Sequence, residues 1–329
     1  MGDDSLNRQL ERALRTAYAE AYPHERKRVI KLPKSRDSEP SDFKLSGNKE
    51  RLRIHLSKNA VLKNMQDDAA AFEGWALALK AWRCVENVEL DWEVPDSEDK
   101  RFGHYRRFLY RVGAFEKLFS PGWFSVRNSE RLDLKNNRNL TINIATAAPR
   151  DPALGSKEAA LEKYLTGSNE FANTFRLSSS SRQFPVGLRD TETKKGIFAG
   201  GKSAIDIVGI GTDGMLWVFE LKAEKNQRLG ILSELLFYCS MMRDLAEGKF
   251  GYERRESKDT GRMHPREVVG RKKICGCLLA PGFHPLLAGN RIVNLLNKAA
   301  EANDDAVRYC SYILSREPFS FERVVSDYK

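Results

Sequence analysis

The stretch that decides the fold is G-G-K-S-A-I-D-I-V-G-I-G-T-D-G-M-L-W-V-F-E-L-K, residues 200–222. Its two apolar runs, 203–210 and 215–221, are separated by a Gly-Thr-Asp-Gly turn signal and therefore predict a β-hairpin. The expected turn is a three-residue loop in which Gly214 takes the left-handed conformation that a G1 bulge requires. The rest of the chain is interpreted around this hairpin.

The pairing of the two strands decides which charged side chains meet. A three-residue loop pairs Gly211 with Met215 and puts Asp206 directly opposite Glu220. Since side chains alternate along a strand, Lys222 lies on the same face as Glu220. Facing carboxylates repel, so we expect a cation between the two acids, and their oxygens suit Mg²⁺ or Mn²⁺. The alternative is a solvated hairpin end that exposes a glutamate and a lysine.

These residues match the motif of a nuclease family. Asp206, thirteen intervening residues and then Glu220-Leu-Lys222 on a second strand, with a helical run after it, resemble the PD-(D/E)xK superfamily. The similarity covers roughly 156–280, and Ile205 stands where the motif's name has proline. The resemblance implies a restriction-endonuclease-like core, a mixed sheet flanked by helices, with a metal held by Asp206 and Glu220. It also implies that Lys222 helps to position or activate the attacking water and stabilises charge on the phosphate.

The acid-x-Lys tripeptide is common in this chain, as at 192–194 and 256–258, and has little meaning alone. The copy at 220–222 differs because it ends an apolar strand that follows a second strand with an acid. This context, and not the tripeptide, favours the nuclease interpretation.

The first helix of the nuclease-like region supplies two candidate supporting acids. Ser156 can cap a helix on which Glu158 and Glu162 share a stripe with apolar residues. The superfamily often brings a further acid from its first helix toward the metal, so the resemblance makes either glutamate a candidate. Exposed glutamates at the rim of the helix are the alternative.

A second helix, expected at 226–246, supplies another candidate pair. Glu234 and Tyr238 stand four residues apart on it. Some members of the superfamily carry a Gln-x-x-x-Tyr pair near the site at this place, and here glutamate replaces glutamine. The resemblance therefore implies supporting roles for Glu234 and Tyr238.

Charge and cysteine content limit the class of protein. The 329 residues contain 55 Lys/Arg against 45 Asp/Glu, a net charge of +10 that favours a polyanionic partner. The five cysteines show no zinc spacing and indicate a reducing compartment, so we expect a cytoplasmic protein. The sequence has no signal-peptide core and no run of membrane-spanning length, so no membrane partner is expected.

Residues 1–150 are predicted to form an N-terminal mixed α/β domain of unassigned role. The small, proline-containing segment 145–155 would join it to the nuclease-like domain at 151–329. The expected elements of the N-terminal part are helices at 5–22, 69–82 and 103–119 and a strand at 88–94. The polar segment 31–49 is expected to be a loop or disordered.

The helix at 103–119 carries the candidate nucleic-acid-binding residues. Arg107 and Arg111 stand one turn apart, opposite an apolar stripe. Residues 101–150 hold ten Lys/Arg against three Asp/Glu, which favours a phosphate-binding surface; a solvated helix face is the alternative. The basic segment 250–273 is a second candidate surface.

We conclude from the sequence that the chain is an α/β protein and a Mg²⁺-dependent or Mn²⁺-dependent nuclease. The expected substrate is nucleic acid, with DNA favoured, in genome defence or restriction, and a homodimer is one expected assembly. Two alternatives remain: a catalytically inert nucleic-acid-binding module with a nuclease-like fold, and a protein-interaction scaffold whose positive charge is incidental.

Overall fold

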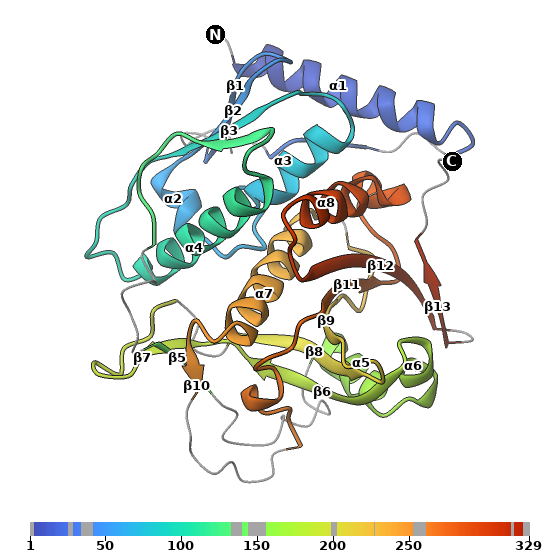
Figure 1. Cartoon of the computed structure of the whole chain (residues 1–329). Helices are drawn as coiled ribbons and strands as arrows, with labels where there is room; N and C mark the ends of the chain where they lie inside the picture. Colours follow the sequence, from blue (N-terminus) through green and yellow to red (C-terminus); the bar gives the residue numbers. More distant parts are fainter. Residues whose placement is uncertain are drawn as a thin grey trace.

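The computed structural model describes residues 3–25, 29–33, 42–132, 140–143, 156–198, 203–226, 228–252, 261–316 and 319–324. It is a mixed α/β protein in which mixed sheets are flanked by helices (Figure 1). The domain boundary predicted at 145–155 lies outside the described residues. Among the described helices, none is long and apolar enough to cross a membrane.

The described helices and strands follow in chain order. The helices are α1 (Asp3–Ala21), α2 (Lys58–Val61), α3 (Phe72–Ala81), α4 (Phe102–Phe119), α5 (Lys157–Thr166), α6 (Asn169–Thr174), α7 (Gly230–Ala246) and α8 (Arg291–Ala302), with 3-10 turns η2 (Pro265–Glu267) and η3 (Pro285–Asn290). The strands are β1 (Phe43–Gly47), β2 (Leu52–Leu56), β3 (Val88–Trp92), β4 (Phe124–Val126), β5 (Leu140–Ile142), β6 (Leu177–Pro185), β7 (Leu188–Asp190), β8 (Ala204–Gly211), β9 (Leu216–Leu221), β10 (Gly251–Tyr252), β11 (Ile274–Ala280), β12 (Val307–Arg316) and β13 (Phe319–Arg323).

A six-stranded sheet in the order β13-β12-β11-β9-β8-β6 forms the framework of the C-terminal part. β9, β11 and β12 run parallel, and the other pairs are antiparallel. Alternation along β9 sends Val218 toward α7 and α8, whereas Phe219 packs against α5 and α6 on the other face. A four-stranded sheet, β1-β2-β3-β4, lies in the N-terminal part, and a small sheet, β10-β5-β7, lies at one edge.

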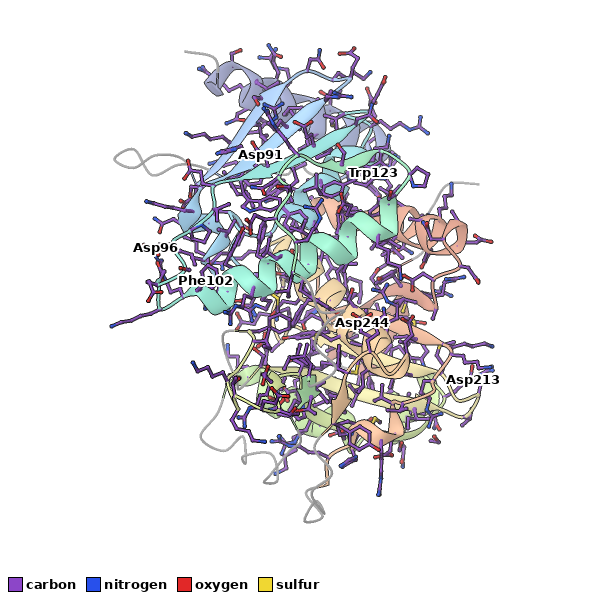
Figure 2. The ribbon with its side chains drawn as sticks, turned by 60° about the vertical axis from the view of Figure 1, so that its left-hand side comes forward. Asp91, Asp96, Phe102, Trp123, Asp213 and Asp244 are labelled. Carbon is purple, nitrogen blue, oxygen red and sulfur yellow. The ribbon has the colours of Figure 1, made fainter. Side chains whose placement is uncertain are left out.

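The hairpin of β8 and β9 has the predicted register. Ile210 pairs with Leu216, and the N–H of Gly211 donates to the carbonyl oxygen of Met215 at 2.8 Å. Gly214 has a φ of +82°, the left-handed conformation that the three-residue loop requires. In Figure 2, Asp213 marks this turn at the edge of the molecule.

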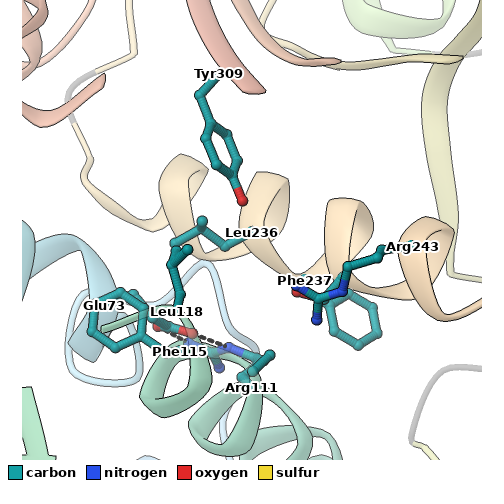
Figure 3. A pocket seen from close by; sticks show the side chains of 10 residues that line it. Glu73, Arg111, Phe115, Leu118, Leu236, Phe237, Arg243 and Tyr309 are labelled. Carbon is teal, nitrogen blue, oxygen red and sulfur yellow. Dashed lines mark hydrogen bonds and ion pairs between the residues drawn. The ribbon is translucent and has the colours of Figure 1, made fainter. Parts of the chain in front are cut away.

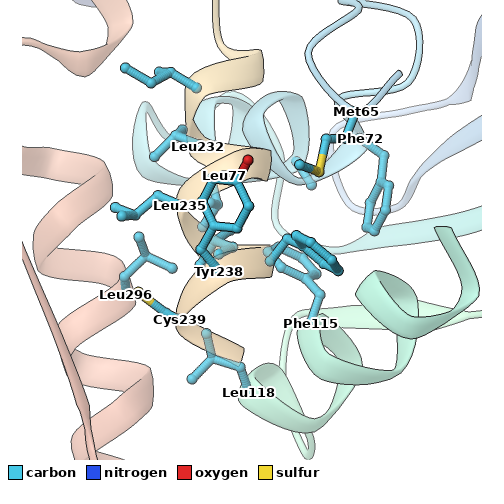
Figure 4. Close-up of a cluster of buried hydrophobic side chains, with 14 of the residues drawn as sticks. Met65, Phe72, Leu77, Phe115, Leu118, Leu232, Leu235, Tyr238, Cys239 and Leu296 are labelled. Atoms are coloured by element: carbon cyan, nitrogen blue, oxygen red, sulfur yellow. The ribbon is translucent and has the colours of Figure 1, made fainter. Parts of the chain in front are cut away.

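Helix α7 lies at the centre of the molecule, and every one of its residues is buried. Figure 4 shows Leu235 and Cys239 of α7 between Leu296 of α8 and Leu118 of α4. The same apolar cluster joins both halves of the chain, so the N-terminal and C-terminal parts share one core. The close approach needs glycine at Gly74, where a Cβ would lie 2.7 Å from a backbone oxygen of the segment before α7.

Most elements expected in the N-terminal part are confirmed, with shifted ends. Helices α1, α3 and α4 and strand β3 lie where the apolar spacing predicts them. The loop expected at 31–49 is wrong in part, because β1 pairs antiparallel with β2 there. Phe43 and Leu45 are buried on the inner face of β1, and two apolar residues among polar neighbours are too short a signal to predict a strand.

Candidate active site

The catalytic residues expected from the sequence meet on the face of the six-stranded sheet that α7 covers. The Lys222 ammonium donates to Glu220 Oε1 at 2.7 Å. Asp206 Oδ2 accepts a hydrogen bond of 2.9 Å from the backbone N–H of Leu221, the residue between the other two. The hairpin register therefore brings two carboxyl groups and an ammonium into one group.

Helix α7 adds Glu234, the position where the sequence suggested a supporting role. Glu234 Oε2 lies 3.4 Å from Lys222 Nζ, and Glu234 Oε1 accepts a hydrogen bond from the side-chain amide of Gln66. Gln66 comes from the segment before α3, so a residue of the N-terminal part contacts the site directly. Tyr238, one turn further along α7, is also buried beside the acids.

Helix α5 brings both of its candidate acids toward Lys222. Its start is as expected, since the Ser156 hydroxyl caps it by accepting from a backbone N–H. Glu158 Oε1 lies 3.8 Å from Lys222 Nζ. Glu162 is 3% exposed and accepts a hydrogen bond of 2.7 Å from the side-chain amide of Gln183 on β6. We call Asp206, Glu220, Glu234, Glu158 and Glu162, around Lys222, the acid cluster.

The acid cluster carries more negative than positive charge at close range. Burial raises the pKa of Asp206 to about 8, and Glu162 and Glu234 add to this effect, while Lys222 and the Leu221 N–H oppose it. Burial, followed by Glu234 and Asp206, raises the pKa of Glu220 well above its usual value. The raised pKa values mean that ionising both carboxyl groups is unfavourable here, and a further cation among them would favour their ionised forms.

Lys222 responds in the opposite direction. Burial alone would lower the pKa of its ammonium, but Glu220, Glu234 and Asp206 hold that pKa above its usual value. The raised pKa keeps the ammonium charged. The side chain is 20% exposed, so the ammonium is reachable from solvent. Burial and the nearby acids also raise the pKa of Tyr238, which stays a neutral phenol at this site.

The donor set of the acid cluster suits a hard divalent cation. Among the described residues, no group of three or more Cys, His, Asp and Glu side chains is arranged to hold a metal ion. Mg²⁺ needs fewer protein ligands, because it commonly keeps several waters and binds through one or two carboxylates together with substrate phosphate. Asp206 and Glu220, two buried carboxyl groups whose pKa values are raised by burial and by neighbouring acids, meet that requirement.

The expectation that Arg107 and Arg111 form an exposed phosphate-binding face is wrong. Both side chains are buried at 4% exposure, because α4 lies between the N-terminal sheet and α7 (Figure 2). The Arg111 guanidinium pairs with Glu73 and also donates to the Ala70 carbonyl at 2.9 Å. Arg107 contacts the Nδ1 atom of His104 at 2.8 Å, and burial lowers the pKa of its guanidinium to about 10.

The pocket between α4 and α7 is not a second candidate for the active site. Figure 3 shows Glu73 and Arg111 on one side of it and Tyr309 on the other. Its volume is about 10 Å³, room for roughly one water molecule. The segment 253–260 of the second expected basic surface lies outside the described residues.

Two site residues were missed by the sequence analysis. Gln66 and Gln183 each hold a buried glutamate by a side-chain hydrogen bond. Neither belongs to a motif, and Gln66 is 168 positions away from its partner Glu234. Only the closing of α3 against the start of α7 brings this pair together.

No family model matches the chain, and neither the curated proteins nor the solved structures contain a match.

Proposed function

We propose that the chain is a metal-dependent nuclease with a restriction-endonuclease-like core, and that it hydrolyses phosphodiester bonds, most favourably in DNA. The observation that carries this proposal is the acid cluster, in which Asp206, Glu220 and Lys222 converge from a hairpin of the predicted register. Excess buried acid is costly to a fold and is typical of a site that holds a cation.

Asp206 and Glu220 are the residues that would hold Mg²⁺ or Mn²⁺. When bound, such an ion lowers the pKa of a coordinated water and offsets charge on phosphate oxygens. Lys222 contributes a fixed ammonium, charged at every physiological pH, that can orient a water or stabilise the developing negative charge. Glu234, itself held by Gln66, lies 3.4 Å from that ammonium and helps to position it together with Glu220.

The nature of the substrate rests on charge. A phosphodiester is an anion, and a net charge of +10 attracts polyanions at long range. The alternative of an inert nucleic-acid-binding module shares this charge and differs only in lacking cleavage. Assembly as a homodimer and a role in restriction belong to the same proposal.

The decisive experiment incubates the pure protein with plasmid, linear duplex, single strand and RNA, with Mg²⁺, with Mn²⁺ and with chelator. We expect cleavage only with a divalent metal. Lys222→Ala should reduce the rate by about 10²–10³, the usual effect of removing one transition-state donor. Asp206→Ala and Glu220→Ala should abolish cleavage, so that adding metal no longer increases the rate. Lys222→Arg should stay strongly impaired, because a guanidinium lacks the compact geometry of the ammonium.

A matched control is Lys157→Ala, since Lys157 is a nearby lysine with 75% exposure that pairs with an exposed glutamate. This variant should cleave at the wild-type rate. Undiminished cleavage in excess chelator, or full activity in Lys222→Ala, would refute the proposal. Binding without any cleavage would support the inert module instead.

A further inference from the structure

A long groove runs between α1, the end of α3 and the start of α8. Its volume is about 1040 Å³, and its floor includes Trp82. In Figure 1, α1 lies along the top of the molecule, above α8. We call this feature the basic groove, after the cationic side chains that line it: Arg12, Lys49, Arg83, Arg291 and Lys298.

The charge of the basic groove is one-sided. Its lining includes five Lys/Arg and one acid, Glu20, whereas the whole chain has 55 Lys/Arg against 45 Asp/Glu. The groove lining is therefore richer in cations relative to acids than the chain as a whole. The cations come from α1, from the turn before β2, from the turn after α3 and from α8, so the fold gathers them from four separate places.

Most of these cations have no carboxylate to neutralise them. Arg12, Lys49, Arg83 and Lys298 are exposed, and none of them forms a salt bridge with a residue that the structure describes. Elsewhere on α1, Arg15 pairs with Glu11 at 3.5 Å, which shows the ordinary arrangement of a surface arginine. Exposed cations that form no salt bridge with a described residue give the groove a net positive potential.

Two contacts hold the Trp82 side chain in the lining of the groove. The Arg291 guanidinium stacks over the Trp82 ring, 4.5 Å from its centroid, and the Trp82 N–H donates to the Leu286 carbonyl at 2.9 Å. Trp82 is 2% exposed, so it supports the groove and offers no open ring for a base to stack on. The cationic side chains of this groove suit contacts to phosphate.

We propose that the basic groove binds the phosphodiester backbone of a nucleic acid. A small anion would need convergent, buried polar groups, whereas these cations are spread along an open groove, as backbone tracking requires. The identification of this nucleic acid as the substrate rests on the proposed nuclease function. Helix α3 connects the two regions. Near its start, Gly74 packs against Leu229, beside the point where Gly230 of α7 meets Gln66, and its ten residues extend about 15 Å toward the groove, four or five nucleotide steps.

The test measures binding without catalysis. Fluorescence anisotropy with a labelled 20-base-pair duplex, in chelator and over a range of salt concentrations, gives the slope of log affinity against log salt. Arg83→Glu/Lys298→Glu and, independently, Arg12→Glu/Lys49→Glu should each flatten the slope by about two units and weaken binding at low salt. The control Lys194→Glu/Lys195→Glu changes net charge equally at exposed sites beyond β7 and should keep the wild-type slope.

Two outcomes overturn the proposal: unchanged slopes in both groove variants, or equal weakening of binding in the control. Thermal melts confirm that each variant is folded before binding is compared. Because binding is measured without metal, it can be compared with cleavage separately. If the protein binds through the groove but does not cleave in the cleavage assay, the proposed nuclease function is refuted and the groove proposal stands. If the protein cleaves nucleic acid but the groove variants keep the wild-type salt slope, the groove proposal alone is refuted.

Discussion

Two neighbouring residues of α7 face two different buried clusters of charge. The Ser233 hydroxyl donates to Glu73 Oε2 at 2.8 Å, where Arg111 neutralises the carboxylate with two further hydrogen bonds (Figure 3). Glu234, the next residue, faces Lys222 and the acid cluster. We call Glu73, Arg111 and Ser233 the paired cluster.

The difference between the clusters lies in their charge balance. In the paired cluster one carboxylate meets one guanidinium, and the hydroxyl of Ser233 and the Ala70 carbonyl complete the hydrogen bonding. In the acid cluster, burial and mutual repulsion raise the pKa values of Asp206 and Glu220 despite the ammonium of Lys222. A buried ion pair with equal charges holds helices together, whereas a buried cluster with more acids than cations is suited to accept another cation.

The largest expected effect is on stability: one substitution in the paired cluster should destabilise the protein, and a matching substitution in the acid cluster should not. Glu73→Gln should lower the free energy of unfolding by about 3–5 kcal/mol, because it leaves the Arg111 charge buried without a partner. Glu220→Gln should leave the metal-free protein as stable as wild type or more stable, since it relieves repulsion among acids. Urea denaturation in chelator measures both variants.

The double variant Glu73→Leu/Arg111→Met serves as the control for the paired cluster. It removes both charges and should regain most of the lost stability. If Glu73→Gln and Glu220→Gln destabilise the protein equally, the two clusters do not differ in the way described.

A smaller effect is expected at the contact between the two halves of the chain. Gln66→Ala removes the amide that holds Glu234 and should reduce cleavage by about 10–100-fold, as is typical for residues that orient groups at a metal site. Asn59→Ala, an amide removed from the exposed side of α2, is the matched control. Wild-type cleavage in Gln66→Ala would show that Glu234 needs no such support.

A different kind of effect is a dependence of stability on pH. Since the pKa of Asp206 is raised from 3.8 to about 8, the folded protein keeps a proton that the unfolded chain releases between about pH 4 and pH 8. Stability of the metal-free protein should therefore fall as pH rises through this window, by up to about 1.4 kcal/mol per pH unit for this group. Asp206→Asn should flatten the dependence, and parallel curves for the two proteins would contradict the assignment.

The sequence predicted the hairpin and its register because local rules control both. Turn residues fix the loop at Gly214, and parity along the strands then fixes which side chains face Glu220. The stripe of α4 was also predictable, since Phe108 and Phe115 recur at helical spacing.

What failed was the interpretation of the opposite face of α4. A helix with charge opposite an apolar stripe normally exposes that charge, but α7 covers the second face and buries Arg111 against Glu73. The contact of Gln66 with Glu234 was equally out of reach, because it depends on the packing of segments far apart in the sequence.

The most direct test of the central claim is calorimetric titration of Mn²⁺ into the protein, without nucleic acid, near neutral pH. The account predicts saturable binding to wild type with release of protons from the acid cluster, and loss of that binding in Asp206→Asn and Glu220→Gln. Equal Mn²⁺ binding by wild type and both variants, or none by wild type, would contradict it.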